Sequence, residues 1–386
     1  MRHIASEPPS CDGFTDAAGL ARIARRQLLK AAVFGSLDDR TLAGGAEHAE
    51  AGTPLSSKPL HVVIGTILDV SPQVLTLQTA GGEERFTLAA STIAWRGTEV
   101  PTVTLRQGDY AIVRCNYTNV TTADKIWAQI GRVTGTITAR DGRTLLVDDG
   151  TGGERKMLVI ADHAISKIQV RFPRLLPGYL IDVIGLTHRG YLEGLIPATA
   201  QPPYRAGQPP RPPLVGGHVP GSISGTATWH EPCDEPADLM GVAYPALDPD
   251  IGCQAPDPGT GCERQASAST ASPGTGDTGA HARDTGAHAR PAGPHAADPH
   301  LAGSGCVRLP YLSLGSTLRV RNDCAQRDLL LPVTGCGATA RLFCDRCIAC
   351  GTSPRGRVAD LTVPAFAALG GDLEAGCFNA TITVGG

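Results

Sequence analysis

The sequence has few aromatic residues, little net charge and no long apolar run. Phe, Trp and Tyr make up 4% of the 386 residues, so any aromatic platform on the surface must be small. The formal net charge of −3 gives no electrostatic reason to expect binding to nucleic acid. No stretch is long and apolar enough to span a bilayer as a helix. These absences argue against a basic nucleic-acid-binding surface and against a helical membrane span.

What is present suffices for two or three domains with real cores, because 41% of the residues are hydrophobic. Gly (47) and Pro (30) together make up about a fifth of the chain, which predicts long irregular segments. Composition separates four regions: a signal and spacer (1–57), short apolar runs typical of many short strands (58–197), a proline-rich, semi-rigid linker (198–222) and a cysteine-rich domain (223–386).

The second region contains an internal repeat. Gly65-Thr66-Ile67 recurs as Gly135-Thr136-Ile137, and Gly108-Asp109-Tyr110 recurs as Gly178-Tyr179-Leu180, each at an offset of 70 residues (from 65 to 135 and from 108 to 178). A unit of about 65 residues with five or six strands predicts a small β-barrel, OB-like in type. Such units are similar to small repeated barrels of bacterial exported proteins, a likeness that implies no activity. The two predicted barrels cover 58–130 and 131–197.

The cysteines are unevenly placed. Of the twelve, Cys11 and Cys115 stand alone, and the other ten all lie in the C-terminal domain. A dense, even-numbered set in one domain predicts a disulfide framework and therefore an oxidising compartment. The predicted disulfide cysteines are Cys233, Cys253, Cys262, Cys306, Cys324, Cys336, Cys344, Cys347, Cys350 and Cys377.

Two patterns have a metal-binding alternative. The C-x₂-C-x₂-C spacing of Cys344–Cys350 is also found in zinc and iron–sulfur sites, but seven further cysteines and predicted export favour disulfides. Within the low-complexity stretch 265–305, three histidines follow one another at seven-residue spacing, which leaves a metal-binding tail as the alternative to a disordered, solvated linker. We expect no bound metal and no cofactor. The three histidines are His281, His288 and His295.

The N-terminal region fits export. Ala24–Lys30 contains a pair of arginines ahead of the apolar run Ala31–Leu37, which resembles a twin-arginine signal, and Ala49-Glu50-Ala51 is a plausible cleavage site. The alternatives are an amphipathic cytoplasmic helix or a mispredicted start, because the apolar run is short and Asp38-Asp39 end it. The cysteine pattern favours export, so we expect an extracytoplasmic protein.

Three segments of the C-terminal domain carry a family resemblance. Gly225–Trp229 reads G-T-A-T-W, and Leu309–Val320 contains L-P-Y followed by L-G-S-T-L-R-V. Asp345–Leu369 contains D-R-C-x-x-C and R-x-x-D-L-T-x-x-A-F-x-x-L, the most specific of the three. In this order the segments resemble the rare lipoprotein A and expansin families. The resemblance implies a six-stranded double-psi β-barrel over 223–386 with one short helix.

The sequence independently predicts that helix. Phe366 and Leu369 have the i, i+3 spacing of an apolar helix face, and Thr362 is a reasonable N-cap. Asp360 would then lie at the end of a strand, close to the positive N-terminus of the helix. Such a position can hold a carboxylate at the rim of a groove.

The resemblance implies catalytic roles for three residues. In the related endoglucanases and lytic transglycosylases, the carboxylate that matches Asp360 is the general acid that protonates the glycosidic oxygen. Asp345 matches a second acid, and Thr228 matches the threonine that lies beside the acid. Where the endoglucanases carry their base, this chain has His230, which argues against an inverting hydrolase. A lytic transglycosylase or a non-catalytic wall-binding protein remains.

Structural alternatives exist for these residues. Asp360 could only cap the helix or pair with Arg357, and Asp345 could tie loops together. Trp229 and His230 are candidate substrate-binding residues, although strand alternation would equally allow Trp229 to lie in the core. The resemblance thus implies an exported, cell-wall-associated protein that acts on the glycan strands of peptidoglycan or a related polysaccharide, with a non-catalytic binding or structural module as the alternative.

Overall fold

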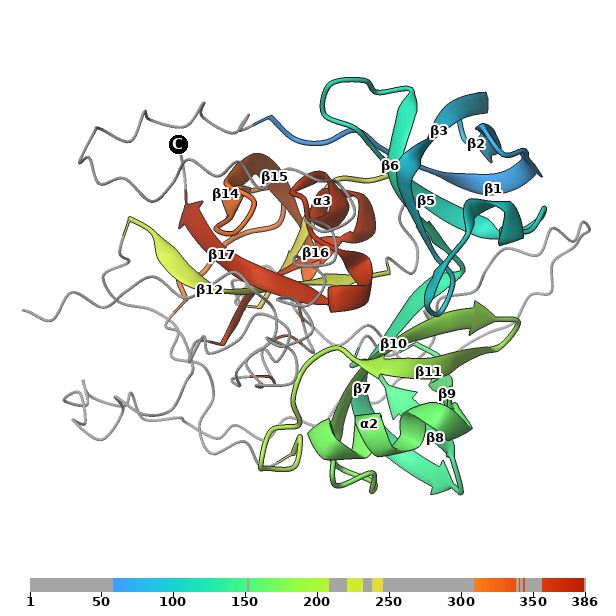
Figure 1. Cartoon of the computed structure of the whole chain (residues 1–386). Coiled ribbons are helices and arrows are strands. Elements are labelled where there is room, and N and C mark those ends of the chain that lie inside the picture. The colour runs from blue at the N-terminus through green and yellow to red at the C-terminus, as the bar shows by residue number, and fades with distance from the viewer. Residues whose placement is uncertain are drawn as a thin grey trace, which may run out of the picture.

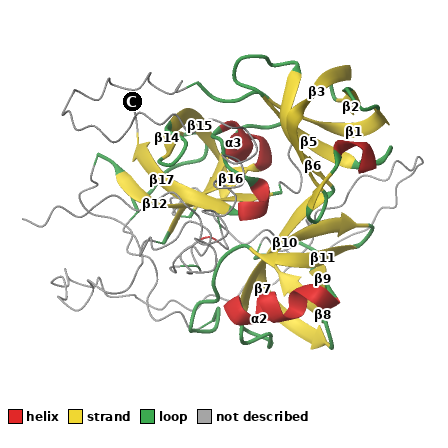
Figure 2. Ribbon diagram, viewed as in Figure 1, coloured by secondary structure: helices red, strands yellow, loops and turns green. Residues whose placement is uncertain are grey.

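The computed structural model describes residues 58–150, 153–207, 221–231, 238–245, 309–337, 340, 343 and 356–384. These residues form an almost entirely β structure with short helices (Figure 2). The strands close into three small barrels, which we call the N-terminal, middle and C-terminal barrels (Figure 1). The predicted all-β fold class is therefore confirmed. Within the described residues, no helix has the length and apolar character needed to cross a membrane.

The N-terminal barrel closes because its second strand pairs with both the first and the third, and its third pairs in parallel with its last. The short strand β4 extends one edge. The elements are β1 (Val62–Val70), β2 (Val74–Thr79), β3 (Gly82–Trp95), β4 (Glu99–Val100), the 3₁₀ turn η1 (Thr102–Thr104), β5 (Tyr110–Cys115) and β6 (Thr122–Ala128).

The middle barrel repeats this five-stranded ring with the same pairing order, including the parallel pair of its third and fifth strands. A short helix occupies the crossing between the third and fourth strands. The predicted pair of small OB-like barrels is thus present. The elements are β7 (Ile130–Asp141), β8 (Thr144–Asp148), β9 (Lys156–Ile160), η2 (Asp162–Ala164), α2 (Ile165–Arg171), β10 (Leu180–His188) and β11 (Tyr191–Pro197).

The repeated glycines have a geometric reason. A Cβ atom on Gly65 or Gly135 would lie 2.4 or 2.2 Å from a backbone carbonyl oxygen of the facing strand, closer than any real side chain comes. Gly108 and Gly178 both adopt a left-handed backbone, with φ of 86° and 87°, at the turns before β5 and β10, respectively. The sequence repeat therefore marks two places in each barrel where glycine avoids strain.

The C-terminal barrel has six strands in the closed order β12-β16-β13-β15-β14-β17. The pairs β12–β16 and β13–β15 are parallel, and the other neighbours are antiparallel. The elements are β12 (Ile223–His230), β13 (Val242–Tyr244), β14 (Thr317–Asn322), β15 (Arg327–Cys336), β16 (Arg357–Thr362), α3 (Val363–Ala368), η5 (Leu373–Ala375) and β17 (Cys377–Val384).

The predicted short helix is α3, with Phe366 in its buried face and Leu369 at its C-cap. Thr362 occupies the N-cap position, but its hydroxyl accepts a hydrogen bond from the backbone N–H of Gly241 at 3.1 Å and does not cap the helix. The threonine therefore ties the approach to β13 to the end of β16. The expected capping role was wrong, because the Thr362 hydroxyl binds the backbone N–H of Gly241, the residue before β13.

One apolar cluster joins the three barrels, and the N-terminal and middle barrels each have a further core of their own. Side chains of the first two barrels pack with the buried residues of the third, and Figure 1 shows the C-terminal barrel beside both. The N-terminal pair is therefore part of one packed body, which a chain of independent spacers would not form. The contributing side chains are Trp95, Ile112 and Trp127 from the N-terminal barrel, and Ile130, Ile184 and Ala198 from the middle barrel and the residue after it.

Composition placed residues 198–207 in the linker, but they pack against the middle barrel. Thr199 is only 3% exposed. The side-chain amide of Gln201 donates to the carbonyl oxygen of Leu180 at 2.9 Å. The first part of the proline-rich stretch thus behaves as an extension of this barrel.

The cysteine predictions have mixed outcomes. Cys115 is a free thiol in the N-terminal barrel, as expected of a lone cysteine, and burial is the main reason that its pKa is raised to about 12. Cys324 is half-buried, and its place in the predicted disulfide set stays a prediction. Cys377 is disulfide-bonded. The side chains of the other eight lie outside the described residues: Cys233, Cys253, Cys262, Cys306, Cys336, Cys344, Cys347 and Cys350.

Candidate functional site

The structure brings together two of the three predicted catalytic residues. β12 and β16 run in parallel, with Thr228 directly opposite Asp360. The Thr228 hydroxyl donates to Asp360 Oδ1 at 2.8 Å. Thr228 is fully buried and Asp360 is 6% exposed. Asp345, the second predicted acid, lies outside the described residues.

His230 lies on the same face of β12 as Thr228, because alternate residues of a strand share a face. Its Nδ1 atom is 3.8 Å from Asp360 Oδ1, a distance suited to an ion pair and too long for a hydrogen bond. The side chain is 27% exposed. His230 is thus the member of the cluster that connects the buried carboxylate to the surface.

The surroundings of Asp360 favour its charged form. Burial alone would raise the pKa of Asp360, but the contact with His230 and the positive charges of Arg132 and Arg357 outweigh burial and lower it. The carboxylate is therefore ionised at neutral pH. An ionised carboxylate accepts protons and hydrogen bonds, whereas a general acid must hold a proton, so this environment does not favour the predicted acid role.

The Trp229 side chain points away from Thr228, His230 and Asp360. It is 1% exposed, and its indole N–H donates to the carbonyl oxygen of Leu373 at 2.9 Å. Of the two alternatives for this residue, the structure has the core position, so a sugar cannot stack on the indole ring in this conformation.

Two further polar groups lie on the same side of β12. Thr226 shares the face of Thr228 and His230, and it pairs across the sheet with Asn379 of β17. Thr226 is 1% and Asn379 5% exposed, yet the Thr226 hydroxyl and both amide atoms of Asn379 have no hydrogen-bond partner in the described part of the chain. We call Thr226, Thr228, His230 and Asn379 the polar row. Unmade hydrogen bonds of buried groups cost about 1–3 kcal/mol each.

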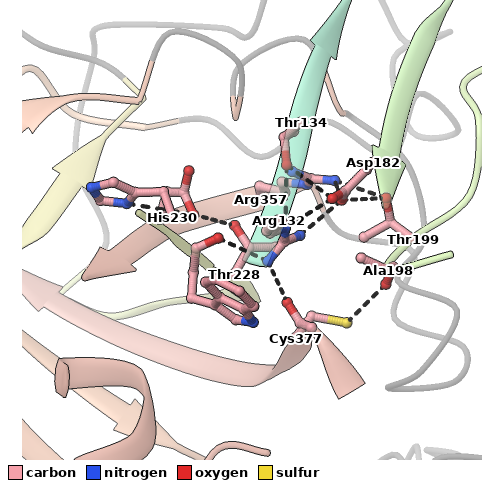
Figure 3. Close-up of polar contacts among 12 residues, drawn as sticks. Arg132, Thr134, Asp182, Ala198, Thr199, Thr228, His230, Arg357 and Cys377 are labelled. Carbon is pink, nitrogen blue, oxygen red and sulfur yellow. Dashed lines mark hydrogen bonds and ion pairs between the residues drawn. The ribbon is translucent and has the colours of Figure 1, made fainter. Parts of the chain in front are cut away.

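A buried ionic cluster adjoins the polar row, and the sequence reasoning missed it. Arg132 of β7 donates from Nε and Nη2 to the two carboxylate oxygens of Asp182 on β10, at 2.8 Å each (Figure 3). Arg357 of β16 donates to the same carboxylate, as does the Thr199 hydroxyl at 2.7 Å. Burial would raise the pKa of Asp182, but the two guanidinium groups outweigh it and lower the pKa strongly. The only feature of the sequence that could have indicated this cluster is the single charged residue, Asp182, inside the apolar run Leu180–Gly185.

Within the described ranges, no three His, Cys, Asp or Glu side chains lie close enough together to hold a metal ion. The arrangement therefore offers an ionised carboxylate, an imidazole and several hydrogen-bonding groups. This chemistry suits a neutral ligand rich in hydroxyl groups.

Comparison with known proteins assigns no family. No family model matches the sequence, and no curated protein matches it significantly. Among solved structures, one similar chain is a multidomain protein with nucleic acid binding domains from Streptococcus pneumoniae, at 14% identity and a TM-score of 0.13. The match covers 44% of this chain and 55% of that one, so this chain spans about half of that protein's length. A similarity at this level carries no argument about the fold or the function.

Proposed function

We propose that the chain is an exported cell-wall protein whose C-terminal barrel binds the glycan strands of peptidoglycan or a related polysaccharide. The observation that carries the proposal is the Thr228–Asp360 hydrogen bond between β12 and β16. The resemblance to rare lipoprotein A and the expansins implies this threonine beside this carboxylate, on the strands of a six-stranded barrel. The closed six-stranded barrel is compatible with that implication.

The chemistry of the polar row supports a carbohydrate ligand. An ionised carboxylate accepts hydrogen bonds from hydroxyl groups, and a side-chain amide such as that of Asn379 can both donate and accept. Glycan strands present many neutral hydroxyl groups in a row. Thr226 and Asn379 are almost fully buried, so the partly exposed His230 is the member of the polar row that a ligand reaches in this conformation.

Binding without cleavage is the activity that the geometry supports best. Asp360 is held in its ionised form, and the indole of Trp229 is buried away from the site. Low aromatic content is also compatible with a small binding surface.

Glycan cleavage of the lytic-transglycosylase type is the second candidate. The contact of the partly exposed His230 with Asp360 favours it, because a histidine beside a carboxylate is a common proton-transfer pair in enzymes. In that reaction the 6-hydroxyl of the substrate attacks its own anomeric carbon, so a single proton-transferring centre could suffice.

Sedimentation with purified sacculi tests the proposal. We expect the wild-type protein to pellet with sacculi and Asp360→Asn to bind on the order of tenfold more weakly, because loss of a charged acceptor costs at least about 1.5 kcal/mol. The matched control is Asp328→Asn, which removes an ion pair with Arg319 on the β14–β15 edge, away from β12 and β16. Release of anhydro-muropeptides, followed by mass spectrometry, would establish the second candidate. Absence of any sacculus binding by the wild type, or equal weakening by Asp328→Asn, would overturn the proposal.

A further inference from the structure

One ion pair of the middle barrel reaches all three strands that form the candidate site. Arg132 Nη1 donates to the carbonyl oxygen of Trp229 on β12 at 2.9 Å, and to that of Gly376, immediately before β17, at 2.8 Å. Its partner Asp182 binds Arg357, the first residue of β16. The Arg132–Asp182 pair therefore fixes β12, β16 and β17 relative to one another.

The contact to Trp229 falls inside the polar row. The carbonyl group of Trp229 lies in the backbone between Thr228 and His230, so this hydrogen bond anchors the part of β12 from which both side chains project. The Arg132 guanidinium also lies over the indole ring of Trp229, 5.4 Å from its centroid. Arg132 thus holds both the backbone and the side chain of the residue between the two polar groups.

The charges of the cluster are balanced across the barrel interface. Arg132 and Arg357 have side chains 2% exposed, and Asp182 is fully buried. Two cations and one anion leave a positive charge that the Asp360 carboxylate offsets, because both arginines act on Asp360. Buried ion pairs gain little net stability, since desolvation opposes the attraction between the charges. Their clearest effect is to specify one arrangement of the groups around them.

We propose that Arg132 and Asp182 are positioning residues for the candidate site. They belong to the middle barrel, but they hold the strands of the C-terminal barrel in place, and Arg132 supplies a positive charge that acts on Asp360. The middle barrel accordingly completes the site, and its role goes beyond that of a spacer or a separate wall-binding unit. The part of this inference that concerns ligand binding rests on the proposed function.

The N-terminal barrel provides a matched control. Its Arg114 and Lys125 bind Asp372 of the C-terminal barrel, at 3.1 Å each. This is also an ionic contact between barrels, but the Asp372 side chain is 45% exposed and none of the three residues acts on Asp360. Asp372→Asn therefore weakens an interface of the same kind without altering the candidate site.

Carbon-13 NMR of the Asp side-chain carboxyl groups in the full chain tests the inference without a ligand. The double variant Arg132→Gln, Asp182→Asn removes one charge of each sign, so no net charge is left buried by the change. The loss of the Asp182 anion favours a lower pKa of Asp360, but Arg132 is one of the main charges that lower this pKa and Asp182 is not, so we expect Asp360 to titrate at higher pH in the double variant. In Asp372→Asn its titration should be unchanged. An unchanged Asp360 titration in a folded double variant would overturn the inference.

Arg132→Lys separates position from charge. It retains the positive charge but cannot reach Asp182 and two carbonyl oxygens with one planar fork. We expect the titration of Asp360 to stay close to that of the wild type while sacculus binding falls roughly tenfold, as the loss of one or two hydrogen bonds implies. Full binding by Arg132→Lys would overturn the positioning role. If the wild type does not bind sacculi, the proposed function fails, and the NMR titration still decides the electrostatic role of Arg132.

Discussion

Thr228 and Asp360 lie directly opposite each other in the parallel pair β12–β16, although 132 residues separate them along the chain. Neither residue reaches the other unless β12 and β16 pair. The candidate site therefore forms only when distant parts of the chain have assembled, and changes to this hydrogen bond should affect stability as well as ligand binding.

The hydroxyl of Thr228 can be removed with little change of shape. Thr228→Val leaves the buried Asp360 carboxylate without its 2.8 Å donor. We expect the free energy of unfolding to fall by about 1–3 kcal/mol, measured by urea denaturation at pH 7. Thr228→Ser, which retains the hydroxyl, is the control. Equal losses for the two variants would mean that the methyl group matters and the hydrogen bond does not.

Stability should depend on pH through Asp182 and Asp360. The folded protein lowers the pKa of both carboxyl groups, so it binds fewer protons than the unfolded chain, whose Asp pKa is about 3.9. Their contribution is fully present above this value and is lost as pH falls through the lower folded values. We expect the urea midpoint to decrease below about pH 5.

In Asp360→Asn the urea midpoint should decrease less steeply at acid pH (the acid limb of the stability curve), because one of the two linked groups no longer titrates. Asp162→Asn is the control, since that side chain is 83% exposed and pairs only at the surface with Arg143. An acid limb that is equally steep in wild type and Asp360→Asn would show that Asp360 is not linked to folding.

The repeat glycines give a prediction about packing. In Gly135→Ala the new methyl group would lie 2.2 Å from the carbonyl oxygen of Asp148, so β7 and β8 must move apart. We expect a loss of about 1–3 kcal/mol and a lower melting temperature. Gly207→Ala is the control, because no heavy atom lies within 4 Å of the position that its new Cβ atom would take. A melting temperature of Gly135→Ala equal to that of the control would contradict the close approach.

Limited proteolysis tests the predicted disorder of residues 265–305. This segment separates β13 from β14, whereas β12 pairs with β16 and β17, and β13 pairs with β15 and β16. A cut within it should give two bands on a denaturing, reducing gel but one peak in size-exclusion chromatography without reductant. Fragments that separate on the column without reductant would show that the two sides do not form one barrel.

Local patterns predicted the barrels well. The glycines at 65, 108, 135 and 178 are visible in the sequence because the same geometric restriction occurs twice. The Thr228–Asp360 pair followed from motifs on two strands that the family resemblance places side by side.

The ionic cluster could not be predicted in the same way. Arg132 and Asp182 are 50 residues apart, and Asp182 and Arg357 are 175 apart, on strands of different barrels. Nothing in a strand pattern specifies which surface of one barrel meets another. For the same reason the sequence left open the side of β12 to which Trp229 points, since alternation defines two faces but not the one that is covered.

The position of β17 in its barrel has a consequence for the order in which the protein can fold during synthesis. Ser224 on β12 and Thr381 on β17 are neighbours across the sheet but 157 residues apart, and β17 also pairs with β14. The N-terminal and middle barrels contain all their strands by Pro197, so both can close while the rest is still being translated. The edge of β12 that pairs with β17 then stays unpaired until β17 has left the ribosome. Throughout this interval the preformed Arg132–Asp182 pair presents a surface on which the third barrel can assemble.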